Sequence, residues 1–149
     1  MRVSDLLRRS AVGIRPHQTV AEAAGIMDQA GVGILAVVDD EGALLGVVTD
    51  RDLVRRVMAR GLPPDARVDS AMTTPVVAVD ADEDVHEAYR RFRSHDARRL
   101  AVVRGRRFVG IVSIDDMIID LAGDLSDLAR PIAGEVKAAQ RDSPVPATT

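Results

Sequence analysis

The chain has no cysteine and no tryptophan, and its 149 residues include only one tyrosine and two phenylalanines. The lack of cysteine excludes disulfides, thiolate metal ligands and thiol nucleophiles, and it favours a cytoplasmic protein. The scarcity of aromatic residues leaves the core to aliphatic side chains and removes the stacking surfaces that hold single-stranded nucleic acid. Because the formal net charge is −3, the chain also lacks the basic field that a polyanion requires, so nucleic-acid binding is disfavoured.

Membrane insertion, metal binding and catalysis also find little support. No stretch approaches the roughly 20 apolar residues of a membrane span, and the first residues lack the apolar segment of a secretory signal. The three histidines, His17, His86 and His95, are too scattered for a spaced metal motif, so we expect no metal site. No histidine or lysine stands near the carboxylates described below, so we expect no catalytic residues and no enzyme activity.

The most informative feature that is present is an internal repeat. Residues 46–53 (GVVTDRDL) and 110–117 (GIVSIDDM) share a glycine, a β-branched run, a hydroxyl residue and a carboxylate three positions later. Upstream, residues 34–38 correspond to 99–103 at an offset of 65. The offset falls to 64 after a hairpin turn, where a loop tolerates the loss of one residue. The chain is therefore a tandem duplication.

Each repeat has the pattern of a βαββα unit. Apolar periodicity predicts helices over residues 20–30 and 85–95, each followed by a two-stranded hairpin and a second helix. The two helices of the first repeat carry one-sided apolar stripes, which are Ala23, Ala24, Met27 and Ala30 on the first and Leu53, Val54, Val57 and Met58 on the second. One repeat cannot cover both stripes, so we expect an α/β (α+β) fold in which two repeats pack sheet to sheet with pseudo-twofold symmetry. We predict a first repeat at residues 1–62, a second repeat at residues 63–128, and a partly disordered C-terminal tail at residues 129–149.

The repeated motif places a hydroxyl and a carboxylate together at a helix start. Asp52 and Asp116 could accept hydrogen bonds from the two hydroxyl groups of a ribose. Thr49 and Ser113 lie where backbone N–H groups and the helix dipole favour a phosphate. These four residues are candidate ligand-binding residues.

A phosphate beside a carboxylate needs additional positive charge. The second repeat supplies it as Arg98 and Arg99, immediately before a predicted strand, whereas the first repeat has Gly33 and Ile34 at the corresponding place. We therefore expect the cleft of the second repeat to be the better phosphate site.

A purely structural interpretation fits the same residues. A hydroxyl residue followed three positions later by an acid is a common helix N-cap signature, and a duplication copies caps as readily as sites. Arg98 and Arg99 lie in an arginine-rich stretch and could be solvated charges. The pattern alone favours capping over ligand binding.

The doubled layout resembles the cystathionine β-synthase (CBS) domain pair over about residues 3–125, on the strength of residues 46–53, 110–117 and the strand at 36–40 (AVVDD). The resemblance implies a regulatory module that binds an adenosine-containing ligand, such as AMP, ADP or ATP, between its repeats. It adds Val32 and Gly33 as candidates for the adenine wall. It also implies a homodimer and, because no effector domain is fused, an effector protein in trans.

Two other functions stay open at this point. The first is a ligand-free dimerisation or scaffold module whose clefts are empty. The second is a small enzyme acting on nucleotides, which would turn over ATP or a dinucleotide.

Overall fold

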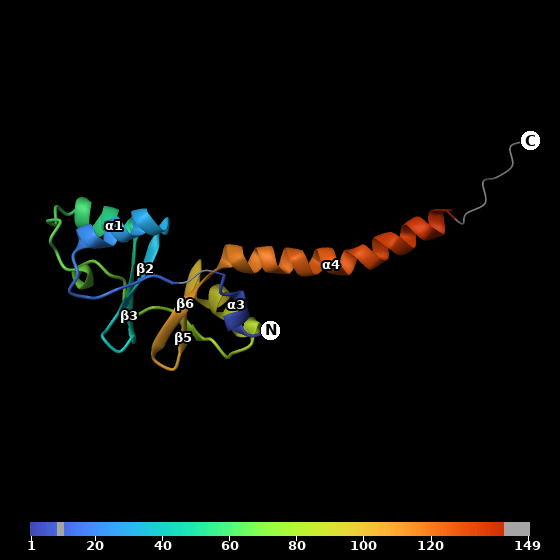
Figure 1. Cartoon of the computed structure of the whole chain (residues 1–149), viewed down its shortest axis with the longest axis horizontal. Helices are drawn as coiled ribbons and strands as arrows, with labels where there is room; N and C mark the ends of the chain where they lie inside the picture. Colours follow the sequence, from blue (N-terminus) through green and yellow to red (C-terminus); the bar gives the residue numbers. More distant parts are fainter. Residues whose placement is uncertain (9–10, 142–149) are drawn as a thin grey trace, which may run out of the picture. The chain divides into compact units, whose positions relative to one another are not determined.

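The computed structural model describes residues 1–8 and 11–141. They form a mixed α+β structure with two three-stranded sheets, one for each repeat (Figure 1). Contacts divide the chain into two units, Met1–Ile114 and a second that starts at Asp115. Both repeats' sheets belong to the first unit, and the second unit consists of most of the last helix.

The two repeats have the same element order, so the predicted βαββα fold class is confirmed. In each sheet the first strand is parallel to the second, which pairs antiparallel with the third. The elements of the first repeat are β1 (Gly13–Ile14), α1 (Val20–Ala30), β2 (Ile34–Val38), β3 (Leu44–Thr49), α2 (Asp50–Asp52) and the π-helical η2 (Leu53–Met58). Those of the second are β4 (Ala78–Asp80), α3 (Val85–His95), β5 (Arg99–Arg104), β6 (Arg107–Ser113) and α4 (Ile114–Arg141).

Helices α1 and α3 occupy the predicted residues because their ends carry strong capping signals. The Thr19 hydroxyl accepts the N–H of Glu22, and the Asp84 carboxylate accepts the N–H of His86. Each helix ends at a left-handed residue, Gly31 with φ 64° and Asp96 with φ 48°. Such termination breaks the helical hydrogen bonding and turns the chain toward the next strand.

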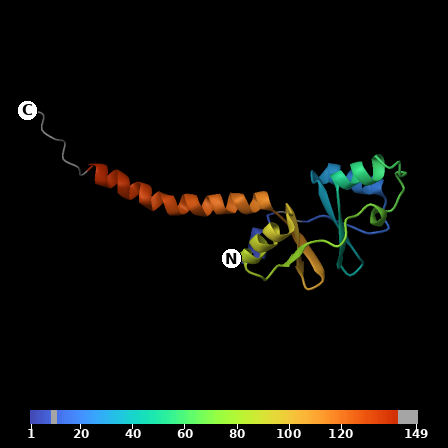
Figure 2. The ribbon, with the colours of Figure 1, turned by 180° about the vertical axis from the view of Figure 1, so that it is seen from behind.

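The two hairpins lie side by side, with their turns together at the bottom of Figures 1 and 2. The N–H of Leu44 donates to the carbonyl of Arg106 (3.2 Å), and the N–H of Phe108 donates to the carbonyl of Gly42 (3.0 Å). Each residue of one bond corresponds to a residue of the other at the repeat offset of 64. The two bonds are therefore related by the expected pseudo-twofold symmetry.

The first segment of each repeat packs on the other repeat. The N–H of Val3 donates to the carbonyl of Glu83 (2.9 Å), and the N–H of Val68 donates to the carbonyl of Gln18 (2.8 Å). Val3 and Val68 are both fully buried, in the short 3₁₀ helices η1 (Val3–Leu6) and η3 (Val68–Ser70). The sequence repeat begins at these segments, but in space they are exchanged between the repeats.

The same exchange explains the glycine that opens each repeated motif. A Cβ atom at position 46 would lie 2.8 Å from both the Met72 sulfur and the Thr73 carbonyl oxygen, and one at position 110 would lie 2.7 Å from a Leu7 methyl group. Leu7 and Met72 correspond at the offset of 65. Both glycines thus make room for a segment arriving from the other repeat.

The core of the first repeat is aliphatic, as the composition requires. Strand residues Leu35, Val37 and Val48 pack with Ala23 and Met27 of α1, and Val68 completes the cluster. Of the predicted stripe on the second helix, Val57 is buried and Leu53 packs against the core, whereas Val54 and Met58 are exposed.

Helix α4 extends beyond the predicted second repeat. It runs to Arg141 with Pro131 inside it, so residues 129–141, which the sequence analysis places in the tail, are helical. Residues 142–149 lie outside the described residues. Among the described helices, none has the length and apolar character needed to cross a membrane.

Candidate functional site

The predicted residues of the first repeat meet where β2 begins and β3 ends. Ile34 and Thr49 are partners in the strand register, and the N–H of Asp50 donates to the carbonyl of Gly33 (3.0 Å). A Cβ atom on Gly33 would lie 3.0 Å from the Asp50 carboxylate. The structure therefore brings Gly33 and Thr49 together, with little space for a side chain at position 33.

Thr49 and Asp52 form a reciprocal capping box. The Thr49 hydroxyl accepts the N–H of Asp52 (3.0 Å), and the Asp52 carboxylate accepts the N–H of Thr49 (3.0 Å). That carboxylate also accepts the Thr73 hydroxyl at 3.2 to 3.3 Å and lies 3.8 Å from the Arg56 guanidinium. Only 13% of the Asp52 side chain is exposed, so this carboxylate has a structural role even though aspartate replaces the glutamate or glutamine usual in such a box.

The Val32 side chain packs mainly against the core of the first repeat. The N–H of Val32 donates to the carbonyl of Met27 (3.1 Å) at the end of α1. Because part of the side chain is still accessible, Val32 keeps its predicted place beside Gly33 at the start of β2.

The second repeat reproduces this geometry with different side chains. Arg99 and Ser113 are register partners, and the N–H of Ile114 donates to the carbonyl of Arg98 (2.9 Å), as Asp50 does to Gly33. Arg98 and Arg99 are exposed and Ser113 is half-buried. The structure thus brings Arg98, Arg99 and Ser113 to one end of the β5–β6 hairpin. Asp116 lies in the first turn of α4, in the second unit.

The two hairpin ends differ in charge. Two guanidinium groups stand in the second repeat where the first has a glycine and an isoleucine. Since Arg carries a permanent charge and several donors in one plane, it suits phosphate oxygens. The backbone is duplicated, whereas the positive charge at these two positions is present only in the second repeat.

A groove of about 920 Å³ lies elsewhere on the second repeat, and the sequence analysis missed it. None of the eight predicted residues lines it. It is lined by the segment before β4, the first residue of β4 and several residues of α3: Pro75, Val76, Val77, Ala78, Glu87, Arg90, Arg91, Arg93, Ser94 and His95. The arginine-rich stretch of α3 was the available signal, but a run of charges does not by itself reveal a groove.

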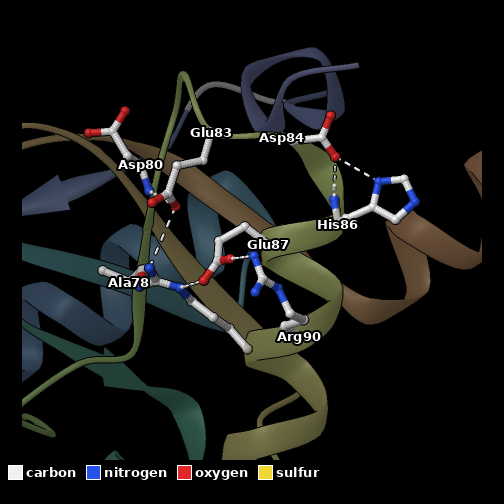
Figure 3. A network of polar contacts seen from close by, with 8 residues as sticks. Ala78, Asp80, Glu83, Asp84, His86, Glu87 and Arg90 are labelled. Carbon is white, nitrogen blue, oxygen red and sulfur yellow. Dashed lines mark hydrogen bonds and ion pairs between the residues drawn. The ribbon is translucent and has the colours of Figure 1, made fainter.

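Figure 3 shows a network of polar contacts around the start of α3 and β4, beside this groove. The Arg91 guanidinium donates to the carbonyl of Ala78 and to the carboxylate of Glu87 (3.1 Å). At the start of the helix, the His86 N–H and ring hold the pKa of Asp84 below its usual value. The bond from Arg91 to Ala78 fixes α3 to the edge strand β4, whereas the other two contacts lie within the helix and its N-cap.

No metal centre is found within residues 1–8 and 11–141. No group of three or more His, Cys, Asp or Glu side chains in this part of the chain could hold an ion.

Comparisons with known proteins are consistent across sequence and structure. The family model described as CBS domain matches twice, at residues 3–59 and 68–123. The CBS domain-containing protein YhcV of Bacillus subtilis is 33% identical over 118 residues, covering 79% of this chain and 84% of its own length. These matches extend over both repeats.

Two similar solved structures contain adenosine compounds. A CBS domain protein from Pyrobaculum aerophilum complexed with AMP has a TM-score of 0.71 and 27% identity, covering 83% of this chain and 99% of that one. The CBS domain pair of protein MJ0100, in complex with 5′-methylthioadenosine and S-adenosyl-L-methionine, has a TM-score of 0.72 and 26% identity, covering 83% and 98%.

Proposed function

The chain belongs to the CBS domain family, and from this premise we propose that it is a regulatory protein that senses an adenosine-containing ligand of the AMP, ADP or ATP class. The ligand binds between the repeats and modulates a separate effector protein. Two similar solved structures with adenosine compounds support the ligand class. The role is that of a binding module and not of an enzyme.

The observation that carries the proposal is the meeting of Arg98, Arg99 and Ser113 at the end of the β5–β6 hairpin. Strand alternation points neighbouring side chains to opposite faces, so one of the two arginines faces the ligand while the other faces away. The arginine and the Ser113 hydroxyl bind phosphate oxygens, and Asp116 keeps its predicted role of accepting hydrogen bonds from the ribose.

The cleft of the first repeat is the weaker of the two. Its Asp52 carboxylate accepts the Thr49 N–H and the Thr73 hydroxyl, so this carboxylate also has a structural role. No arginine stands beside Gly33 or Val32 in the sequence. We expect this cleft to hold the ligand loosely or to accept an uncharged adenosine compound.

Regulation follows from a shift between conformations. A ligand that contacts both repeats favours the mutual orientation that binds it best, and an effector protein that prefers this orientation responds. The protein acts in the cytoplasm as a homodimer.

Isothermal titration calorimetry with AMP, ADP and ATP tests the ligand. Asp116→Ala should weaken binding by about 10- to 100-fold, and so should one of the two variants Arg98→Ala and Arg99→Ala, the one whose side chain faces the ligand, which is the typical effect of removing a charged hydrogen-bonding partner. Matched controls are Arg106→Ala, near the opposite end of the same hairpin, and Asp124→Ala, two turns further along α4. Both controls should bind as the wild type does.

Absence of saturable binding by every nucleotide would sink the proposal and favour the ligand-free scaffold, which the Thr49–Asp52 capping box already supports for the first repeat. Equal weakening by Arg106→Ala would instead show a diffuse charge effect with no specific site. Mass spectrometry of protein purified from its native host would detect a nucleotide retained from the cell.

A further inference from the structure

The groove of about 920 Å³ beside α3 has an apolar part and a cationic part. The apolar part is residues 75–77 (PVV), the segment that leads into β4, in which both valines are half-buried. The cationic part consists of Arg90, Arg91 and Arg93 of α3. Both parts belong to the unit Met1–Ile114, so one ligand in the groove contacts apolar and charged side chains together.

The lining of the groove carries a net positive charge. Glu87 is the acid that lines it, and its carboxylate forms ion pairs with Arg90 and Arg91. Because three arginines and one glutamate line the groove, its net charge is +2 with His95 neutral. The Arg90 side chain is still 70% exposed, and Arg93 is exposed without an ion pair to any described residue. The groove is thus a local positive surface on a chain of net charge −3, and it attracts anionic groups.

The first repeat shows that the fold does not require these charges. At the repeat offset of 65, the three arginines correspond to Gly25, Ile26 and Asp28 of α1. Ile26 packs against the core of the first repeat, and a Cβ atom on Gly25 would meet nothing within 4 Å. The same helix therefore forms in the first repeat without a cation at any of the three positions. Shared architecture does not account for Arg90 and Arg93, which points to a role in binding.

The outer edge of β4 is already occupied by side chains. The Arg91 guanidinium donates to the carbonyl of Ala78. The Glu83 carboxylate accepts the N–H of Asp80 (3.2 Å), as Figure 3 shows. Since these backbone groups of the edge strand have partners, a ligand in the groove is held by side-chain contacts and not by addition of a strand to the sheet.

The two parts of the groove together select the chemistry of the ligand. A polyphosphate or a nucleic acid would match the arginines but would leave the apolar segment 75–77 without a contact. An uncharged apolar peptide would desolvate the guanidinium groups without pairing them. A peptide with both carboxylates and aliphatic side chains matches both parts.

We propose that the groove beside α3 binds an acidic, aliphatic peptide segment of the effector protein. Carboxylates of the peptide pair with Arg90 and Arg93, and its aliphatic side chains pack against residues 75–77. The proposal rests on the proposed function, which requires an effector protein, and it names the surface that binds this partner. It uses none of the eight candidate ligand-binding residues, so the two proposals can fail separately.

Fluorescence anisotropy of the full chain, without nucleotide, tests the groove with a fluorescein-labelled heptapeptide, Glu-Val-Asp-Leu-Glu-Val-Asp. The wild type should bind it saturably. The double variant Arg90→Ala with Arg93→Ala should weaken binding by about 10-fold or more, because two charged partners are lost. The control Arg55→Ala with Arg60→Ala removes the same charge from exposed positions of the first repeat and should bind as the wild type does. A peptide with serine in place of valine and leucine should also bind about 10-fold more weakly, since it cannot pack on residues 75–77.

Four outcomes would overturn the proposal. No saturable binding of the heptapeptide would show that the groove does not take this chemistry. Equal weakening by the control variant would show a diffuse charge effect. Equal binding of the serine peptide would show that the apolar segment has no part in recognition. Tighter binding of tripolyphosphate or of a DNA duplex, weakened by Arg90→Ala with Arg93→Ala, would assign the groove to a polyanion.

A fluorescent label locates the peptide, and the absence of cysteine in the chain makes the labelling specific. Ser94→Cys places an environment-sensitive dye in the lining of the groove, and Gln29→Cys places it at the corresponding exposed position of α1. The heptapeptide should change the emission of the first protein and not of the second, and the reverse result would refute the location. Asp116→Ala should keep full peptide binding. Loss of peptide binding with AMP binding retained would refute this proposal alone.

Discussion

Replacing Gly46 with alanine is the sharpest test of how the two repeats are joined. The added Cβ atom would lie 2.8 Å from the carbonyl oxygen of Thr73 and 2.8 Å from the sulfur of Met72. The Met72 side chain can rotate away, but the Thr73 backbone is held by two hydrogen bonds with Val47, of 2.7 and 3.0 Å. Relieving the overlap therefore requires the exchanged segment to move off β3.

The expected change in the free energy of unfolding follows from comparing alanine substitutions at three glycines. Overpacking against fixed atoms costs about 1 to 3 kcal/mol, and we place Gly46→Ala at the upper end, about 2 to 3 kcal/mol, because backbone must shift. Gly110→Ala meets only the Leu7 side chain, whose terminal methyls can rotate, so about 1 kcal/mol is expected. Gly25→Ala, in α1 with nothing within 4 Å, should stabilise the fold by about 0.5 to 1 kcal/mol.

Urea unfolding followed by circular dichroism measures all three free energies, with similar slopes if the unfolded states are alike. Combining Leu7→Ala with Gly110→Ala should cost less than the sum of the two single changes, because the smaller side chain leaves room for the new methyl. If Gly46→Ala were as stable as the wild type, or gained stability as Gly25→Ala does, the close approach of the exchanged segment would be wrong.

Two further predictions concern capping and pH. Thr49→Val removes the hydroxyl that accepts the Asp52 N–H and should cost about 1 kcal/mol in urea unfolding, whereas Thr49→Ser should be close to neutral; equal stability of the two variants would disprove the capping role. The N–H groups of Asp82 and Gly105 hold the pKa of Asp80 below its ordinary 3.8, so its contribution to stability is complete above that value and is lost as pH falls through the lowered pKa. Asp80→Asn should therefore lose less stability than the wild type between about pH 5 and about pH 3, and identical losses would contradict this cause.

The fold was predictable from sequence where local signals determine local structure. Helices α1 and α3 begin and end at the predicted residues because Thr19 and Asp84 cap their starts and Gly31 follows the first of them. The hairpins follow from alternating apolar residues and short polar turns. Duplication made these signals appear twice, which strengthened each one.

Long-range features were not predictable in the same way. The segments around Val3 and Val68 have similar patterns, so nothing in the sequence shows which of the two sheets each one contacts. Periodicity also fades near Pro131 and Gly134, although the surrounding alanines and long polar side chains still favour a helix. The local sequence pattern indicates which secondary structure a segment favours, but it does not indicate which other segment it packs against.

The candidate site was predicted in part. The positions of Thr49, Ser113, Arg98 and Arg99 at strand ends follow directly from the βαββα order. The Asp52 carboxylate also accepts a hydrogen bond from Thr73, which follows the exchanged helix η3. No local motif in the sequence predicts this long-range contact. The groove along α3 likewise depends on how the helix meets the edge strand.

Because η1 and η3 each pack on the other repeat, a cut between the two sequence repeats separates each of these segments from the residues that it contacts. A fragment cut after residue 62 would keep η1 without the sheet that covers Val3, and it would lack the Val68 side chain that fills its own interior. The residues that pack around the first sheet instead form a stretch from about residue 11 to residue 73, which joins one repeat to the first residues of the next. Gene truncations, fusions or recombination joints placed at the sequence midpoint would therefore damage both halves at once.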